Sequence, residues 1–220
     1  MKTFNGVQIP TTPADMVDPG RAALVVYDMQ VGVCRQIADA GAVIGAVGRV
    51  LDAARATGMR VIFTRHMSLP KEMMGAMAFR TAMAWQRQDT PEAVGSWFLR
   101  DSEAFGLIPD LVPRASEVVL DKITMSAFEG SPLSIILRDC GLTTAVFVGV
   151  ALEIGIEPSV RHAADLGFTP VVIADACGWG NPVAAERTLA AMRFTGDAMI
   201  TDVGAFAGLL DAHRRKAPPA

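Results

Sequence analysis

Six apolar segments of strand length recur along the chain, and helical patterns separate most of them. The segments cover 22–30, 60–66, 116–122, 144–150, 168–175 and 197–203. Continuous apolar runs of this kind are typical of parallel strands that are buried on both faces. Strands that alternate with helices are joined by right-handed crossovers. The sequence therefore predicts an α/β fold: an open, mostly parallel six-stranded sheet with helices on both faces, in a Rossmann-like three-layer arrangement.

Four stretches between these segments have a helical pattern, and each ends on a glycine, at 42–58, 131–141, 157–167 and 182–196. Glycine most readily takes the left-handed conformation that closes a helix. In sheets of this kind, ligands bind beyond the carboxyl ends of the strands, near the point where the strand order reverses. Functional residues are therefore expected directly after the strands.

The length and composition predict one domain over residues 1–220, because 220 residues with 51% hydrophobic content can bury one substantial core. The segment 67–112 is too long for an ordinary connection and is rich in methionine and tryptophan. We interpret it as an insertion or lid, in which Trp85 is a candidate substrate contact. A subunit contact and a plain buried helical hairpin are the alternatives, and both stay open.

Charge and hydropathy exclude several classes of partner. The net charge is -3 without a basic stripe, so we expect no nucleic-acid partner. No apolar run reaches the roughly 18 residues of a membrane-spanning helix, and the N-terminal segment lacks a signal-peptide core, so we expect a cytoplasmic protein that binds no membrane. The cysteines and histidines are dispersed, which predicts reduced thiols, no metal and no cofactor. The apolar lid predicts a homo-oligomer.

Two charged residues stand at strand ends. Asp28 closes the first apolar segment, and Lys122 closes the third. An acid and a lysine that converge on one crevice hold each other charged, or exchange a proton when the pocket is dry. The spacing alone also fits a helix-capping aspartate and a solvated lysine.

Three motifs occur in order along the chain. They are "DMQ" at 28–30, Lys122 followed by "SAF" at 126–128, and a "GVA" turn whose helix carries Arg161, Ala163 and Gly167. Together they resemble the isochorismatase-like hydrolase superfamily, which also includes the nicotinamidases and carbamoylsarcosine amidases. The resemblance covers roughly residues 21–203.

The resemblance implies that Gly155 stands where the cysteine hydrolases of this superfamily place their nucleophile. A covalent thioester route is closed at a glycine. The true isochorismatases also carry glycine there, and in them the matching aspartate acts as general acid on a vinyl ether. By this resemblance Asp28 is the general acid or base, Lys122 holds it and balances its charge, and water completes the hydrolysis.

A glycine at this turn also allows backbone amides to approach a ligand closely at a helix start, so we expect an anion hole at Gly155. The resemblance implies a non-proline cis peptide between Val150 and Ala151. It places both residues in the substrate site, together with Gln30. Two further candidates, expected to form the pocket floor, are Ser126 and Phe128.

Glu153 lies in the same turn and would activate water if it faced the pocket. The alternatives are a partner for Arg161 or a carboxylate favoured near a helix start. Among the thiols, Cys177 and Cys34 are weak candidates for a displaced nucleophile, because nothing nearby would lower their pKa. Cys140 lies late in a predicted helix and is interpreted as structural.

These observations predict a cofactor-independent hydrolase that cleaves a vinyl ether C–O or an amide-like C–N bond of a small molecule. A catalytically silent ligand-binding relative and an amidase with a displaced cysteine are the alternatives.

Overall fold

The computed structural model describes residues 1–216 and is built on a six-stranded sheet in which all neighbouring strands are parallel. The strand order is β5-β4-β3-β6-β7-β8. The strands are β3 (Ala22–Tyr27), β4 (Arg60–His66), β5 (Val118–Lys122), β6 (Thr144–Val150), β7 (Thr169–Gly178) and β8 (Met199–Thr201). Each of the six predicted segments supplies one strand, which confirms the predicted fold. The order reverses between β3 and β6, so the expected crevice lies at the ends of these two strands.

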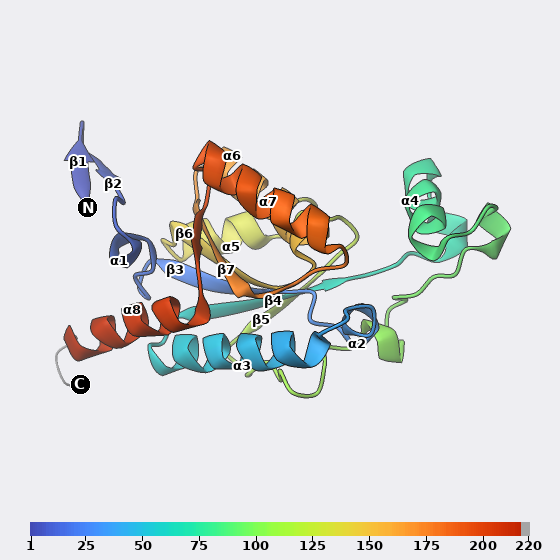
Figure 1. The fold of residues 1–220 in the computed structure, drawn as a ribbon, viewed down its shortest axis with the longest axis horizontal. Helices are drawn as coiled ribbons and strands as arrows, with labels where there is room; N and C mark the ends of the chain where they lie inside the picture. The colour runs from blue at the N-terminus through green and yellow to red at the C-terminus, as the bar shows by residue number, and fades with distance from the viewer. Residues whose placement is uncertain (217–220) are drawn as a thin grey trace.

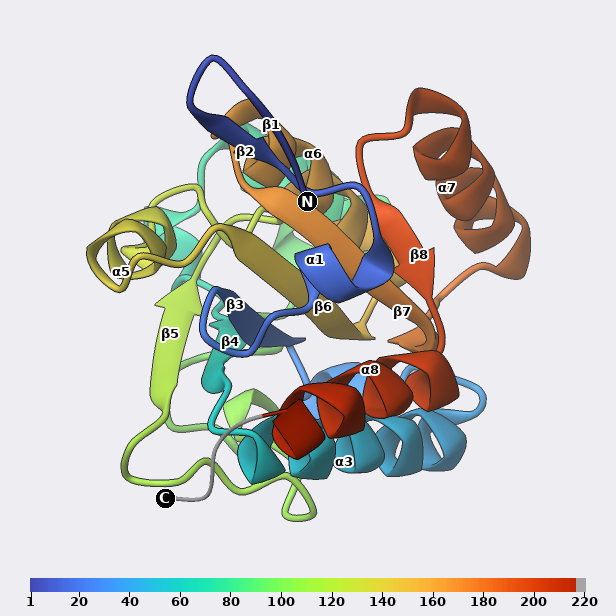
Figure 2. The ribbon, with the colours of Figure 1, turned by 90° about the vertical axis from the view of Figure 1, so that its left-hand side faces the viewer.

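Helices cover both faces of the sheet, as Figures 1 and 2 show. One face carries α3 (Ala40–Ala56) and α8 (Val203–Lys216), and the other carries α5 (Leu133–Asp139), α6 (Glu157–Asp165) and α7 (Pro182–Thr195). Side chains of β3 alternate between the faces, since Leu24 and Val26 pack with α3 while Tyr27 packs on the α5–α6 side. The side chain of Tyr27 therefore points toward the turn that follows β6.

The N-terminal segment adds a two-stranded antiparallel hairpin, β1 (Lys2–Phe4) and β2 (Val7–Ile9), and the short helix α1 (Pro13–Met16). All six strand residues of the hairpin are exposed. A further short helix, α2 (Val31–Cys34), follows β3. None of these elements was predicted from the sequence.

The segment after β4 leaves the body of the protein, and Figure 1 shows α4 (Ala76–Gln86) apart from the sheet. Three short helices accompany it: η1 (Lys71–Met73), η2 (Pro91–Ala93) and η3 (Glu103–Phe105). The buried side chain of Gln30 fastens the base of this segment. Its Nε2 donates to the carbonyls of His66 (3.0 Å) and Phe105 (2.9 Å), and its Oε1 accepts from the His66 amide (2.6 Å). Both arms that lead to α4 are thereby held at the carboxyl edge of the sheet.

Candidate active site

Asp28 and Lys122 form a buried ion pair at the carboxyl edge of the sheet. Asp28 directly follows β3, and Lys122 ends β5, so the lysine side chain reaches across β4. Its Nζ donates to Asp28 Oδ2 at 2.7 Å. Thr64 of the intervening strand donates its hydroxyl to Asp28 Oδ1 at 2.6 Å. The convergence expected from the two strand ends is present, and both carboxylate oxygens accept a hydrogen bond.

The ammonium of Lys122 has three acceptors for its three protons. Besides Asp28 these are the Tyr27 hydroxyl at 2.8 Å and the Thr124 carbonyl at 3.1 Å. Burial lowers the pKa of Lys122, and the charge of Asp28 opposes that shift. A lysine in this position gives up its proton more readily than one in water, and the adjacent carboxylate can receive it.

A cavity of about 320 Å³ opens beside this pair, between the ends of β3 and β6 and the segment around α4. The peptide bond between Val150 and Ala151 is cis, as the resemblance implied, and both residues lie on the cavity wall. The expected contact Trp85 lies there too. The wall is formed by Tyr27, Asp28, Val33, Gln36, Ile37, His66, Trp85, Arg87, Trp97, Phe98, Met125, Val150, Ala151, Ile154, Gly155 and Gly180.

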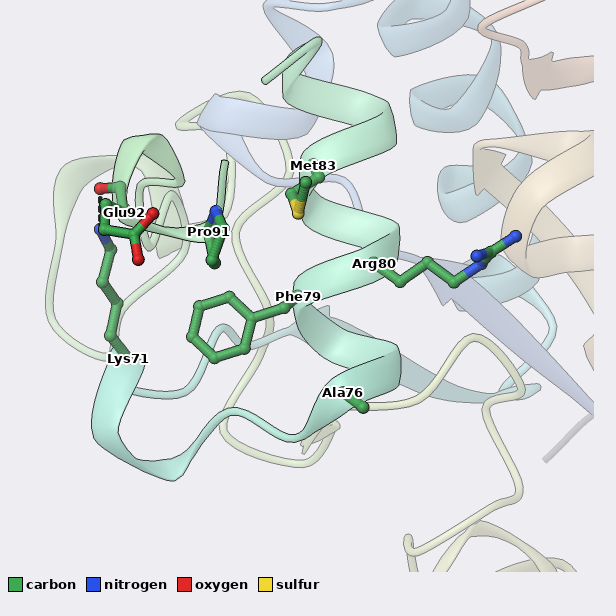
Figure 3. Close-up of a pocket in the computed structure, with 7 residues that line it drawn as sticks. All are labelled: Lys71, Ala76, Phe79, Arg80, Met83, Pro91 and Glu92. Carbon is green, nitrogen blue, oxygen red and sulfur yellow. Dashed lines mark hydrogen bonds between the residues drawn. The ribbon is translucent and has the colours of Figure 1, made fainter. Parts of the chain in front are cut away.

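Two other hollows lie on the α4 segment. One, of about 330 Å³, adjoins the first cavity and shares His66, Trp85, Trp97, Phe98 and Met125 with it. The other, of about 810 Å³, lies between α4 and the contact of Lys71 with Glu92 (Figure 3). Its lining contains neither Asp28 nor any residue of the turn after β6, so its size gives no reason to place the chemistry there.

Ser126 and Phe128, which were expected on the pocket floor, are not among the residues that line this cavity. The Ser126 hydroxyl pairs with His162 Nδ1 at 2.9 Å, and the ring of Phe128 stacks on Phe168 with 5.8 Å between centroids. Phe128 packs in the core beneath α6, Ser126 contacts α6 through His162, and Met125 forms the wall instead. Gln30 likewise is not on the cavity wall, because its amide is occupied by the arms of the α4 segment.

The amide of Gly155, which was expected to contribute to an anion hole, is used within the chain. The turn after β6 is a π-helix, Leu152–Ile156, in which the amides of Ile154, Gly155 and Ile156 all point at one carbonyl, that of Ala151, at 3.3, 3.0 and 3.1 Å. Gly155 lines the cavity, but its N–H is already used within the chain.

Glu153 faces the start of α7. Its Oε1 accepts from the amides of Gly180 (2.8 Å) and Asn181 (2.7 Å), whereas Arg161 pairs with Glu157 and Asp197. A carboxylate at a helix start is favoured by the helix dipole. The helix-start interpretation accounts for Oε1, whereas Oε2 is buried without a hydrogen-bond partner among the described residues.

Three residues of the site were missed by sequence reasoning: Tyr27, Thr64 and His66. All three lie at or near the carboxyl ends of β3 and β4, so the strand-end rule that selected Asp28 was the available signal. Within residues 1–216, Nδ1 of His66 is buried without a hydrogen-bond partner, and burial lowers the pKa of this histidine. A neutral imidazole therefore borders the cavity.

The thiols lie elsewhere. Within the described chain, no cysteine is on the wall of the cavity beside Asp28. Burial raises the pKa of Cys34 to about 11 and raises that of Cys177 further. Neither is an activated nucleophile.

Over residues 1–216 no group of three or more His, Cys, Asp or Glu side chains is placed to hold a metal ion. None of the helices described is both long and apolar enough to cross a membrane.

The sole tyrosine of the chain gives the site a spectroscopic signal. Burial, followed by the charge of Asp28, raises the pKa of Tyr27 well above 10.0. Because the folded-state pKa lies above the unfolded one, Tyr27 stabilises the fold fully below about pH 10, and this contribution is lost as the pH rises further. Tyrosinate absorbance should therefore appear only together with the loss of the circular dichroism signal. Ionisation near pH 10 in a protein that is still folded would contradict this assignment.

Comparison with known proteins shows which family the sequence of this chain matches. The model of the isochorismatase domain matches residues 22–203. Ureidoacrylate amidohydrolase RutB of Methylobacterium radiotolerans is 27% identical over 96% of this chain and 88% of its own length.

Two solved structures have the same fold. A cysteine hydrolase from Pseudomonas syringae pv. phaseolicola superposes with a TM-score of 0.76 at 19% identity, covering 90% of this chain and 96% of that one. An isochorismatase family protein from Burkholderia thailandensis gives a TM-score of 0.73 at 26% identity, covering 89% and 98%. Because the isochorismatase domain model matches residues 22–203, which is most of this chain, the chain belongs to the isochorismatase family of hydrolases.

Proposed function

We propose that this protein hydrolyses a small molecule without a thiol nucleophile and without a cofactor. Asp28 is the proton-transfer group, Lys122 balances its charge, and water acts directly on the substrate. The observation that carries the proposal is the 2.7 Å ion pair of Asp28 and Lys122, buried beside a cavity of about 320 Å³ whose wall includes Gly155. A pair in such surroundings is suited to proton transfer, since burial lowers the pKa of the Lys122 ammonium beside the carboxylate.

Two kinds of bond suit this proton-transfer group. In a vinyl ether, the proton of Asp28 adds to the double bond, water attacks the resulting cation, and the C–O bond breaks. In an amide-like group, Asp28 takes a proton from the attacking water and passes it to the departing nitrogen. Two features support the second: the relatives named ureidoacrylate amidohydrolase, and the two hydrogen bonds that the Asp28 carboxylate accepts, from the Thr64 hydroxyl and from Lys122 Nζ, as expected of a base. We therefore place amide-like C–N hydrolysis first.

The screen that tests this proposal uses vinyl ethers, amides and ureides, with products followed by mass spectrometry before and after treatment with iodoacetamide. We expect turnover of one class of compound, unchanged by the alkylation. Loss of turnover on alkylation would point to a displaced thiol. Saturable binding of a compound without any product would favour the silent ligand-binding relative.

Arg87, which caps α4, is the cation on the wall of this cavity that we propose as a carboxylate anchor. Arginine binds carboxylates through two parallel hydrogen bonds. Arg87→Ala should raise KM for a carboxylated substrate about tenfold and leave kcat nearly unchanged, the loss of one such contact being about 1.4 kcal/mol. The matched control is Arg80→Ala on the same helix, because Arg80 borders the outer hollow. An equal rise in KM for an uncharged analogue, or for the Arg80 variant, would refute the anchor.

We also propose that the protein is a homo-oligomer that uses the apolar surface of the α4 segment. Met73 and Met77 are 70% and 69% exposed. Apolar side chains exposed to this degree on one segment are typical of a protein interface. Light scattering would show whether Met77→Glu converts an assembly into single chains.

A further inference from the structure

The side chain of Tyr27 occupies the space that Gly155 leaves open. A Cβ atom added to Gly155 would overlap the hydroxyl and ring of Tyr27, far inside van der Waals contact. Tyr27 ends β3 and is only 2% exposed, and its side chain also forms part of the cavity wall. The aromatic ring and a side chain at position 155 therefore exclude each other.

The hydroxyl of Tyr27 contacts the catalytic pair as well. It accepts a hydrogen bond from Lys122 Nζ at 2.8 Å and donates to the carbonyl of Met125. The same ammonium lies 4.3 Å from the centroid of the Tyr27 ring. Its remaining acceptors are Asp28 and the Thr124 carbonyl. Tyr27 thus supplies one of three contacts that fix the direction of the ammonium.

We propose that Tyr27 replaces the nucleophilic cysteine as a positioning residue, its ring closing the thiol compartment beside Gly155 and its hydroxyl holding Lys122 toward Asp28. The inference rests on the proposed function for its kinetic consequence only. Tyr27 and Gly155 then form a matched pair. If a smaller residue replaced Tyr27 while Gly155 stayed, a void would open beside the ion pair. If a larger residue replaced Gly155 while Tyr27 stayed, its side chain would have no room.

The steric part of the proposal is tested by exchange. Gly155→Cys alone should lower Tm strongly, because the new Cβ would overlap the buried ring of Tyr27. Tyr27→Val combined with Gly155→Cys should recover much of that loss, since the valine suits a strand and frees the compartment. A single variant as stable as the original protein, or a double variant that is no more stable than the single one, would overturn the matched pair.

The chemical part of the exchange needs no substrate, because iodoacetamide is the probe and mass spectrometry locates the label. In the double variant the thiol introduced by Gly155→Cys should be alkylated at pH 7 at least about tenfold faster than the half-buried native Cys140, since a neighbouring ammonium lowers a thiol pKa. Adding Lys122→Met should remove most of that advantage. An introduced thiol that reacts no faster than Cys140, or that is indifferent to Lys122, would show that the compartment is not beside the ammonium.

The positioning role of the hydroxyl is tested with Tyr27→Phe and ureidoacrylate as the probe. The ring stays in place, so we expect KM to be unchanged and kcat to fall about tenfold. With one acceptor fewer the pKa of Lys122 falls, so the alkaline limb of the kcat profile should move to lower pH, with Asp28 and His66 as the other titrating groups nearby. If Tyr27→Phe lowered Tm but left the pH profile of kcat unaltered, Tyr27 would contribute only to packing and would not position Lys122. If ureidoacrylate is not hydrolysed by the original protein, the similarity to the ureidoacrylate amidohydrolases does not extend to the substrate, and the alkylation experiment still decides whether Tyr27 occupies the thiol position.

Discussion

Replacing Asp28 with asparagine should lower kcat by about a hundredfold or more, with little change in ligand affinity. Asparagine has the shape of aspartate, and its carbonyl oxygen still accepts a hydrogen bond from Thr64 or Lys122. What the variant loses is the ability to take up and release a proton. Initial rates over a range of concentrations give kcat and KM, and calorimetry gives the affinity of the unreacted compound.

Thr64→Val is the matched control for this variant. Valine keeps the shape of threonine and removes only the hydroxyl, which donates to Asp28 Oδ1 at 2.6 Å and accepts from the Asp28 amide at 3.2 Å. The loss of the hydrogen bond to the charged carboxylate corresponds to about tenfold in rate, well short of the effect at Asp28. If Asp28→Asn kept the original rate within a few-fold while Thr64→Val did not, the proton would have to be carried by another group.

The fold was predictable because its signals are local. Each of the six strands is a short apolar run, and four of the covering helices close on a glycine that is visible in the sequence. The hairpin of β1 and β2 was not predictable in this way, since all its strand residues are exposed and no burial pattern marks them. Helix α8 begins at Val203, the last residue of the sixth predicted strand segment, and its pattern was not separated from that segment.

The ion pair of the candidate site was predictable in two steps. The carboxyl ends of parallel strands meet at one edge, which places Asp28 and Lys122 on the same edge, and the resemblance to the hydrolase superfamily supplied the pairing that the spacing alone left open. The floor residues Ser126 and Phe128 failed for the opposite reason. Whether a loop side chain faces a cavity or the core depends on the path of the backbone, and here the loop turns both toward α6.

Tyr27 was missed because a buried aromatic residue in a strand normally needs no explanation beyond the core. Its significance comes from a partner far along the chain, since only the folded structure shows that its ring fills the space beside Gly155. The glycine at position 155 is visible in the sequence, but the aromatic ring that fills the space beside it is not.

Lys122→Met should destabilise the protein by about 3–5 kcal/mol at neutral pH and abolish turnover. The lysine side chain is 1% exposed and that of Asp28 is 6% exposed, so removing the ammonium leaves a buried carboxylate with no countercharge. Urea unfolding, with the free energy extrapolated to water, measures the loss. The variant should regain stability as the pH is lowered. Its unpaired carboxylate takes up a proton more readily in the fold than in the unfolded chain, and protonation removes the buried charge.

The double variant Asp28→Asn/Lys122→Met separates stability from catalysis. With both charges gone, no unpaired ion remains in the interior, and most of the lost free energy of unfolding should return. Turnover should not return, because the proton-transfer group is absent. A double variant that is as unstable as Lys122→Met would mean that the lysine acts through its contacts with Tyr27 and Thr124 rather than through its charge. A Lys122→Met protein that keeps both its stability and its activity would remove the ion pair from the mechanism altogether.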